Sequence, residues 1–128
     1  MKDRQIRAAL KSELFAHYAG DPDTIVIDEL GLRHGASRID LVVVNGSLHG
    51  FELKADRDTL KRLPNQARIY NSVLDSVTLV VGGRHAERAI QVVPDWWGIT
   101  LAEFESDARI CLRELRPPRI APAQEVEV

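Results

Sequence analysis

The sequence lacks most of the features that mark extracellular or membrane proteins. Its 128 residues include a single cysteine, Cys111, so no disulfide can form within the chain. The longest apolar runs, such as LVVV at 41–44, are far too short to span a bilayer. The N-terminus is charged from Lys2 onward and has no uninterrupted apolar stretch like that of a secretory signal. These absences predict a cytoplasmic protein without a membrane partner.

Several kinds of catalytic site are also missing from the sequence. The four histidines are scattered, and with one cysteine they form no zinc-binding spacing. Ser37 and Ser47 have no nearby His–acid pair of the kind that nucleophilic catalysis needs. Gly82-Gly83 lacks the spacing of a loop that cradles phosphate. The chemistry must therefore come from other residues, mainly carboxylates and basic side chains.

The charge of the chain is small overall but uneven along its length. A net charge of -2 and a pI of about 6.1 argue against a protein that coats nucleic acid through bulk positive charge. Between Arg33 and Arg68, however, seven basic residues stand against four acidic ones. This stretch predicts either a local basic groove or a solvated helix face.

The order of expected elements indicates an α/β protein. A helix is expected over 2–18, strands over 24–30, 38–44 and 48–54, a helix over 57–74 that Pro64 kinks or restarts, a strand over 77–81 and a helix over about 84–92. Residues 96–104 and 108–115 look like two final strands. A mixed central sheet flanked by helices is the natural packing, with 1–116 as one domain and 117–128 as a loose Pro-rich and acidic tail.

The first helix carries an acid where an apolar residue is expected. Ile6, Ala9, Leu10 and Leu14 fall on one face at 100° per residue, and Glu13 falls near the centre of the same stripe. A carboxylate among apolar side chains needs a partner. Glu13 is therefore expected to point inward.

The hairpin between 38 and 54 places charges opposite one another if its loop has three residues. Asn45-Gly46 marks the turn. Pairing Val44 with Leu48 puts Asp40 opposite Glu52, with their Cβ atoms roughly 5 Å apart. One face then carries the apolar set Ile39, Leu41, Val43, His49, Phe51 and Leu53, and the other carries Arg38, Asp40, Glu52 and Lys54.

Two facing carboxylates repel each other, and a divalent cation relieves that repulsion. Mg²⁺ prefers one or two carboxylates together with water and phosphate oxygens. The alternative is that Arg38 and Lys54 neutralise Asp40 and Glu52 in a surface ion-pair cluster.

Asp40 followed by Glu52-Leu53-Lys54 resembles the signature of the PD-(D/E)XK nuclease superfamily, although Ile39 stands where the motif has proline. Gln66 and Tyr70 resemble the Gln-x-x-x-Tyr motif of its RecB-like members. The resemblance covers roughly residues 2–82 and extends to small uncharacterised bacterial and phage members. It implies a restriction-endonuclease-like αβββαβ core, to which this chain would add C-terminal strands.

The resemblance also implies a role for each residue. Asp40, Glu52 and the Leu53 backbone carbonyl would ligate Mg²⁺, for which Mn²⁺ would substitute, with Glu13 and Glu29 as additional ligands. Lys54 would orient or activate water. Nucleic acid would be contacted by the remaining candidates, which are Arg38, Arg57, Lys61, Arg62, Gln66 and Tyr70.

The function expected from the resemblance is Mg²⁺-dependent hydrolysis of DNA by an endo- or exodeoxyribonuclease in repair or defence. One alternative is a non-catalytic module that keeps the fold and binds DNA or protein. Another is a nuclease subunit active only with a helicase or DNA-binding partner. A homodimer would supply the binding surface that one small domain lacks.

Overall fold

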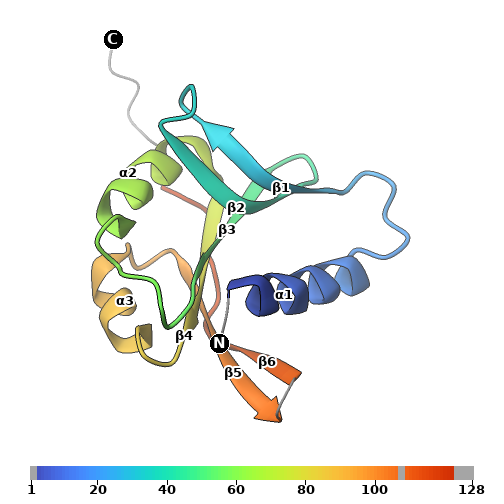
Figure 1. Ribbon diagram of the computed structural model, residues 1–128. Coiled ribbons are helices and arrows are strands. Elements are labelled where there is room, and N and C mark those ends of the chain that lie inside the picture. The colour runs from blue at the N-terminus through green and yellow to red at the C-terminus, as the bar shows by residue number, and fades with distance from the viewer. Residues whose placement is uncertain (1–2, 107–108, 123–128) are drawn as a thin grey trace.

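We analysed a computed structural model that describes residues 3–106 and 109–122 (Figure 1). The helices are α1 (Asp3–His17), α2 (Leu63–Val73) and α3 (Ala86–Val92). The strands are β1 (Ile25–Leu32), β2 (Ser37–Val44), β3 (Leu48–Lys54), β4 (Ser76–Gly82), β5 (Gly98–Ser106) and β6 (Arg109–Arg116). The predicted order of elements is confirmed. Among the described residues, no helix is long and apolar enough to cross a membrane.

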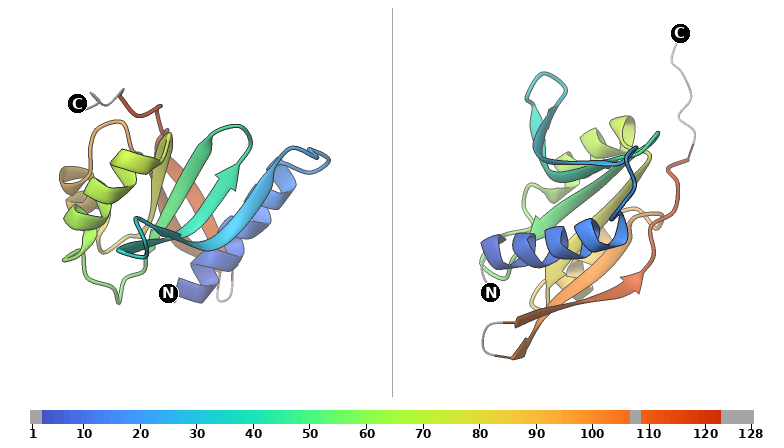
Figure 2. Two further views of the ribbon diagram at one scale, coloured as in Figure 1. Left: turned by 90° about the horizontal axis from the view of Figure 1, so that it is seen from above. Right: turned by 90° about the vertical axis from the view of Figure 1, so that its right-hand side faces the viewer.

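The six strands form one mixed sheet in the order β1-β2-β3-β4-β5-β6. The pairs β3–β4 and β4–β5 are parallel, and the other three are antiparallel. Helices α2 and α3 cover one face of the sheet, and α1 covers the other (Figures 1 and 2). The predicted mixed sheet flanked by helices is therefore confirmed at this level.

A separate apolar cluster lies on each face of the sheet. The face under α2 and α3 packs Tyr70 and Trp97 against Leu79 and Val42. The other face packs Ile6, Leu10 and Leu14 of α1 against the sheet. All seven residues of β4 are buried, as expected for a parallel strand covered on both sides.

Helix α2 is shorter than the sequence predicted. It begins at Leu63 rather than at 57, and residues 57–62 form a loop before it. Pro64 sits in the first turn of the helix, where its fixed φ fits and its missing N–H costs nothing. The proline therefore starts the helix and does not kink it.

The inward orientation predicted for Glu13 is wrong, because this residue is exposed. The buried residues of α1 are Ile6, Leu10 and Leu14, which are spaced by four. This spacing makes a narrow stripe centred near Leu10, and Glu13 lies on its rim.

The three-residue loop predicted for the β2–β3 hairpin is confirmed, since Val44 pairs with Leu48 and Leu41 with Phe51. The face predicted for Ile39 is wrong. Ile39 lies beyond the last backbone pair and packs in the cluster under α2, close to Gly50 and Leu74.

The chain after β6 is tied to the body as far as the structure describes it. The N–H of Arg119 donates to the carbonyl of Trp96, and the N–H of Ala121 donates to the carbonyl of Asp75. The description of this segment as loose is therefore wrong up to Ala121. Residues 123–128 lie outside the described residues.

Candidate functional site

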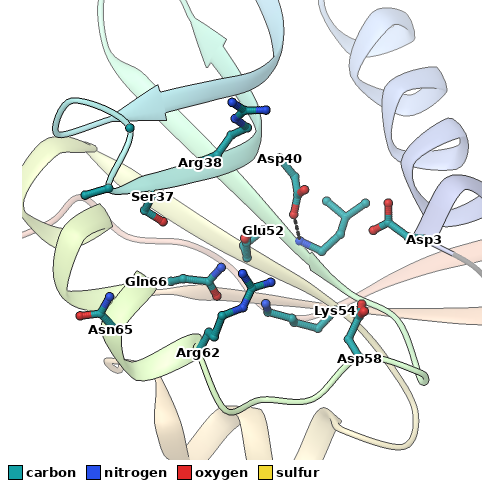
Figure 3. A pocket seen from close by; sticks show the side chains of 13 residues that line it. Asp3, Ser37, Arg38, Asp40, Glu52, Lys54, Asp58, Arg62, Asn65 and Gln66 are labelled. Atoms are coloured by element: carbon teal, nitrogen blue, oxygen red, sulfur yellow. Dashed lines mark hydrogen bonds between the residues drawn. The ribbon is translucent and has the colours of Figure 1, made fainter.

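A polar pocket of about 540 Å³ lies where α1, the centre of β2, the end of β3 and the start of α2 meet (Figure 3). Strand β2 supplies Arg38 and Asp40, and β3 supplies Glu52 and Lys54. The strands also contribute Ser37 of β2 and Leu53 of β3, and the rest of the lining consists of Asp3, Gly35, Ala36, Asp58, Arg62, Asn65 and Gln66. The hairpin thus delivers its charged side chains to one concave surface.

Asp40 lies at the centre of an anchoring network. Its Oδ2 accepts a hydrogen bond of 2.9 Å from the backbone N–H of Leu53, and its Oδ1 accepts one of 2.9 Å from Arg7. Arg7 also donates to the backbone carbonyl of Asp40 at 2.9 Å. The carboxylate therefore replaces a backbone acceptor at the point where the β2–β3 ladder ends, and it ties α1 to the sheet.

Glu52 is a buried acid with a strongly perturbed protonation equilibrium. Burial, followed by the nearby negative charge of Asp40, raises the pKa of Glu52 to about 9. The hydroxyl of Tyr70 lies 3.2 Å from each of its carboxylate oxygens. The same burial raises the pKa of Tyr70. Glu52 therefore carries a proton at neutral pH, while Arg7 neutralises Asp40.

Two further side chains of the pocket lack close partners among the described residues. Lys54 is buried, yet its ammonium group makes no hydrogen bond or salt bridge there. The buried Oε1 atom of Gln66 also has no hydrogen-bond partner. An unpartnered buried amide oxygen is costly. Figure 3 shows Lys54 and Arg62 pointing into the pocket from the side opposite Asp40.

Two neighbouring pockets continue this surface along α2. One is lined by Arg33, Ala36, Arg68, Ile69, Asn71 and Ser72 and shares Ala36 with the central pocket. The other shares Asp58 with it and includes the basic residues Arg57, Lys61, Arg84 and Arg88. We call the lining of these three pockets the basic face.

The structure distributes the sequence candidates unevenly. Asp40, Glu52 and Lys54 share the central pocket with Arg38, Arg62 and Gln66. Tyr70 lies beneath it and contacts Glu52, whereas Arg57 and Lys61 line the adjoining pocket. Glu13 and Glu29 are exposed and line none of the three pockets.

Sequence reasoning missed Arg7, Asp3 and Asp58. On a helical wheel Arg7 falls outside the apolar stripe of α1, and this position indicates a solvent-facing side chain. In the structure, Arg7 pairs with Asp40 and lies 3.7 Å from Asp3. No signal in the sequence marks this pairing, because it joins residues 33 positions apart.

The proposed metal ligands are brought together only in part. Asp40 and Glu52 offer the oxygen donors that Mg²⁺ prefers. Leu53 presents its N–H to Asp40. Within residues 3–106 and 109–122, no group of three or more His, Cys, Asp or Glu side chains could hold a metal ion. The five-residue ligand set expected from the sequence is therefore not assembled, because Glu13 and Glu29 are exposed and lie outside the pocket.

A solved structure resembles this fold closely enough to compare the two chains. It is the SPO1766 protein of unknown function from Silicibacter pomeroyi, with a TM-score of 0.59 and 17% sequence identity. The likeness covers 99% of this chain and 76% of that one. At this identity the comparison shows a shared fold and nothing of activity.

Sequence comparisons point to a phage protein. The model of the family described as bacteriophage P4 protein cII matches residues 1–128. Protein cII of Enterobacteria phage P4 is 35% identical over 85 residues, which are 66% of this chain. The match spans only 31% of the length of that curated relative.

These findings overturn the assignment to the PD-(D/E)XK superfamily. The predictions of a nuclease, of a Mg²⁺-dependent hydrolase and of a nuclease subunit with a helicase partner were wrong, because both comparisons lead to the cII protein. Asp40, Glu52 and Lys54 form a short motif, and such a motif recurs by chance more readily than a match over the whole chain. The chain belongs to the family of bacteriophage P4 protein cII.

Proposed function

We propose that this chain is a DNA-binding phage protein with a regulatory role and that it binds DNA without cleaving it. The observation that carries the proposal is the separation of charge on its surface. The basic face includes nine Lys or Arg residues and four Asp or Glu residues. The whole chain holds 17 basic and 19 acidic residues. Outside the basic face, the chain therefore holds 8 basic and 15 acidic residues.

The cations of the basic face are available to a ligand. Eight of the nine are exposed, and Lys54 alone is buried. In the described part of the chain, none of the nine forms a salt bridge. The nine are Arg33, Arg38, Lys54, Arg57, Lys61, Arg62, Arg68, Arg84 and Arg88. Unpaired cations grouped on one side of an acidic protein suit a phosphate backbone.

The state of the acids within the basic face favours an anionic ligand. Glu52 is neutral at pH 7, because its pKa is raised to about 9. Arg7 offsets the charge of Asp40 through their 2.9 Å salt bridge. The ammonium group of Lys54 and the amide of Gln66, which both line the central pocket, are then positioned to meet a phosphate group.

Mg²⁺ at Asp40 and Glu52 carries over as part of the proposal, with Mn²⁺ as its substitute. Asp40 and Glu52 would hold the ion, which would supply positive charge for an anionic ligand such as a DNA phosphate. Its role would be to strengthen binding. A restriction-endonuclease-like version of the fold, a single domain over 1–116 and a cytoplasmic location likewise remain predictions.

A binding assay with matched variants tests the proposal. The wild type, R57Q/K61Q/R62Q and R109Q/R113Q/R119Q are titrated against a fluorescent 20-base-pair duplex at several salt concentrations. Each triple variant removes three exposed cations, so the two have the same net charge. Phosphate contacts make affinity fall with salt, by a slope of about 0.9 per contact.

We expect the variant on the basic face to bind at least tenfold more weakly, with a shallower salt slope. The control variant should bind about as the wild type does. A denaturing gel of DNA incubated with the wild type and Mg²⁺ should show uncut strands. If both triple variants weaken binding equally, binding depends on net charge alone and the proposal is contradicted.

A further inference from the structure

The turn between β1 and β2 has a conformation that its residues rarely adopt. Three consecutive residues have positive φ, namely Arg33 at 50°, His34 at 57° and Gly35 at 84°. The N–H of Gly35 donates to the carbonyl of Leu32 at 3.1 Å. Positive φ at both central residues of such a turn favours Asn or Gly. Here an arginine and a histidine occupy these positions instead.

The same protein contains a turn built as expected, which makes the contrast clear. The β2–β3 hairpin turns at Asn45-Gly46, and Gly46 has a φ of 92°. Substituting Asn-Gly at 33–34 would relieve strain, because Asn and Gly tolerate positive φ better than Arg and His do. The side chains of Arg33 and His34 must therefore serve a purpose other than forming the turn.

Arg33 is held in place by α2. Its Nε and Nη2 atoms donate to the hydroxyl of Ser72, at 3.2 and 2.7 Å. That hydroxyl donates in turn to the backbone carbonyl of Ile69. The guanidinium group still has donors to spare, because it carries five N–H groups. The Arg33 side chain is therefore held in place by Ser72 and still has N–H groups that can donate to a ligand.

The turn also lies at the junction of two pockets of the basic face. Gly35 and Ala36 line the central pocket, while Arg33 and Ala36 line the neighbouring one. The loop between β1 and β2 projects from the body of the protein near the end of α2 (Figures 1 and 2). A bound polymer that follows α2 would therefore meet this turn.

The basic face offers phosphate contacts but no surface for stacking bases. None of the residues lining its three pockets is Phe, Tyr or Trp, and the one ring among them is the imidazole of His85. Tyr70, Trp96 and Trp97 are buried in the core. Proteins that bind single strands generally stack bases on exposed aromatic rings. A duplex is the better fit, since its outer surface is phosphate and its major groove admits a two-stranded β-ribbon.

We infer that the Arg33-His34 turn is a contact element for duplex DNA, with Arg33 reaching a phosphate or a base edge beside the central pocket. This inference rests on the proposed function and names the form of DNA and a residue that recognises it. The strain in the turn is retained because Asn-Gly would remove the cation from this point.

The test replaces the turn with the sequence that its backbone prefers. R33N/H34G and a control, R113N on the far edge strand β6, each lose one formal charge. Both are compared with the wild type for thermal stability and for binding to a duplex and to a single strand of equal length. We expect the melting temperature of R33N/H34G to equal or exceed that of the wild type. We also expect it to bind the duplex about tenfold more weakly, with a salt slope smaller by about 1.

Each other outcome has a distinct meaning. If R33N/H34G binds the duplex as R113N does, the turn makes no contact and the inference is overturned, while the proposed function stands. If the wild type prefers the single strand, the assignment to duplex DNA is overturned. If the wild type binds neither form, the proposed function itself fails.

Discussion

The phenolic oxygen of Tyr70 lies equally close, at 3.2 Å, to both carboxylate oxygens of Glu52, and both residues are buried. The Tyr70 hydroxyl therefore lies within hydrogen-bonding distance of both oxygens of the Glu52 carboxyl group. This contact couples the packing of α2 on the sheet to the charge state of the central pocket.

Tyr70→Phe removes that hydroxyl and leaves the ring in place. The loss of a buried hydrogen bond should lower the free energy of unfolding by about 1–2 kcal/mol. The pKa of Glu52 should rise further, because the Tyr70 hydrogen bond acts to lower it. Urea unfolding at pH 7 measures the first effect. An unchanged midpoint would mean that the contact contributes nothing to stability.

The raised pKa of Glu52 predicts how stability varies with pH. Between its ordinary value of 4.5 and about 9, the native state holds a proton that the unfolded state has released. The free energy of unfolding should therefore fall as pH rises through this window, by up to about 1.4 kcal/mol per unit. E52Q is a neutral replacement, so its profile should be flatter and it should be the more stable protein at pH 8. If the free energy of unfolding varies with pH in the same way in the wild type and E52Q, titration of Glu52 does not contribute to stability.

Two ion pairs link α1 to the sheet, and they should contribute differently to the free energy of unfolding. Arg7 donates twice to Asp40 in a partly buried setting, whereas Lys11 meets Asp28 at an exposed site. Arg7→Met should cost about 1–3 kcal/mol of unfolding free energy. The matched variant Lys11→Met should cost less than about 1 kcal/mol. Chemical unfolding of both variants checks the order, which equal losses would contradict.

Gly50 tests the packing behind the central pocket. A Cβ at this position would lie 2.6 Å from Leu74 Cδ1 and would also collide with Ile39. Gly50→Ala should therefore destabilise the fold by about 1–3 kcal/mol. Gly83→Ala is the control, because no heavy atom lies within 4 Å of its added Cβ. If Gly50→Ala is as stable as the control, the core must adapt more easily than its packing indicates.

Addition of Mg²⁺ tests the proposed cation at the carboxylate pair. Millimolar Mg²⁺ should raise the melting temperature of the wild type, since a ligand that binds only the native state stabilises it. Asp40→Asn should lose this response, and Glu13→Gln should keep it because Glu13 is exposed on α1. A response that is equal in all three proteins would place the ion elsewhere.

Much of the fold could be predicted from the sequence, because local patterns determine it. Alternating apolar residues and the Asn45-Gly46 turn were enough to predict the register of the β2–β3 hairpin. The apolar run at 77–81 was enough to predict the strand β4, which the structure shows to be buried along its whole length. The start of α2 was misplaced, since helical periodicity extended into residues 57–62 and Pro64 was taken as an interruption.

The candidate site was less predictable, because it depends on residues far apart in the chain. The hairpin could be expected to bring Asp40 and Glu52 together, but nothing local pairs Arg7 with Asp40. The strain at Arg33 and His34 was likewise invisible, because a charged dipeptide carries no turn signal. A three-residue motif also favoured an enzyme family, and comparison over the whole chain corrected this.

The uneven distribution of charge gives the molecule a front and a back. If the basic face engages DNA as proposed, the acidic remainder of the surface turns away from it and repels a second duplex. Such a protein would decorate one double helix without cross-linking two. Each copy would then bind a single duplex through one face and would not bring two duplexes together.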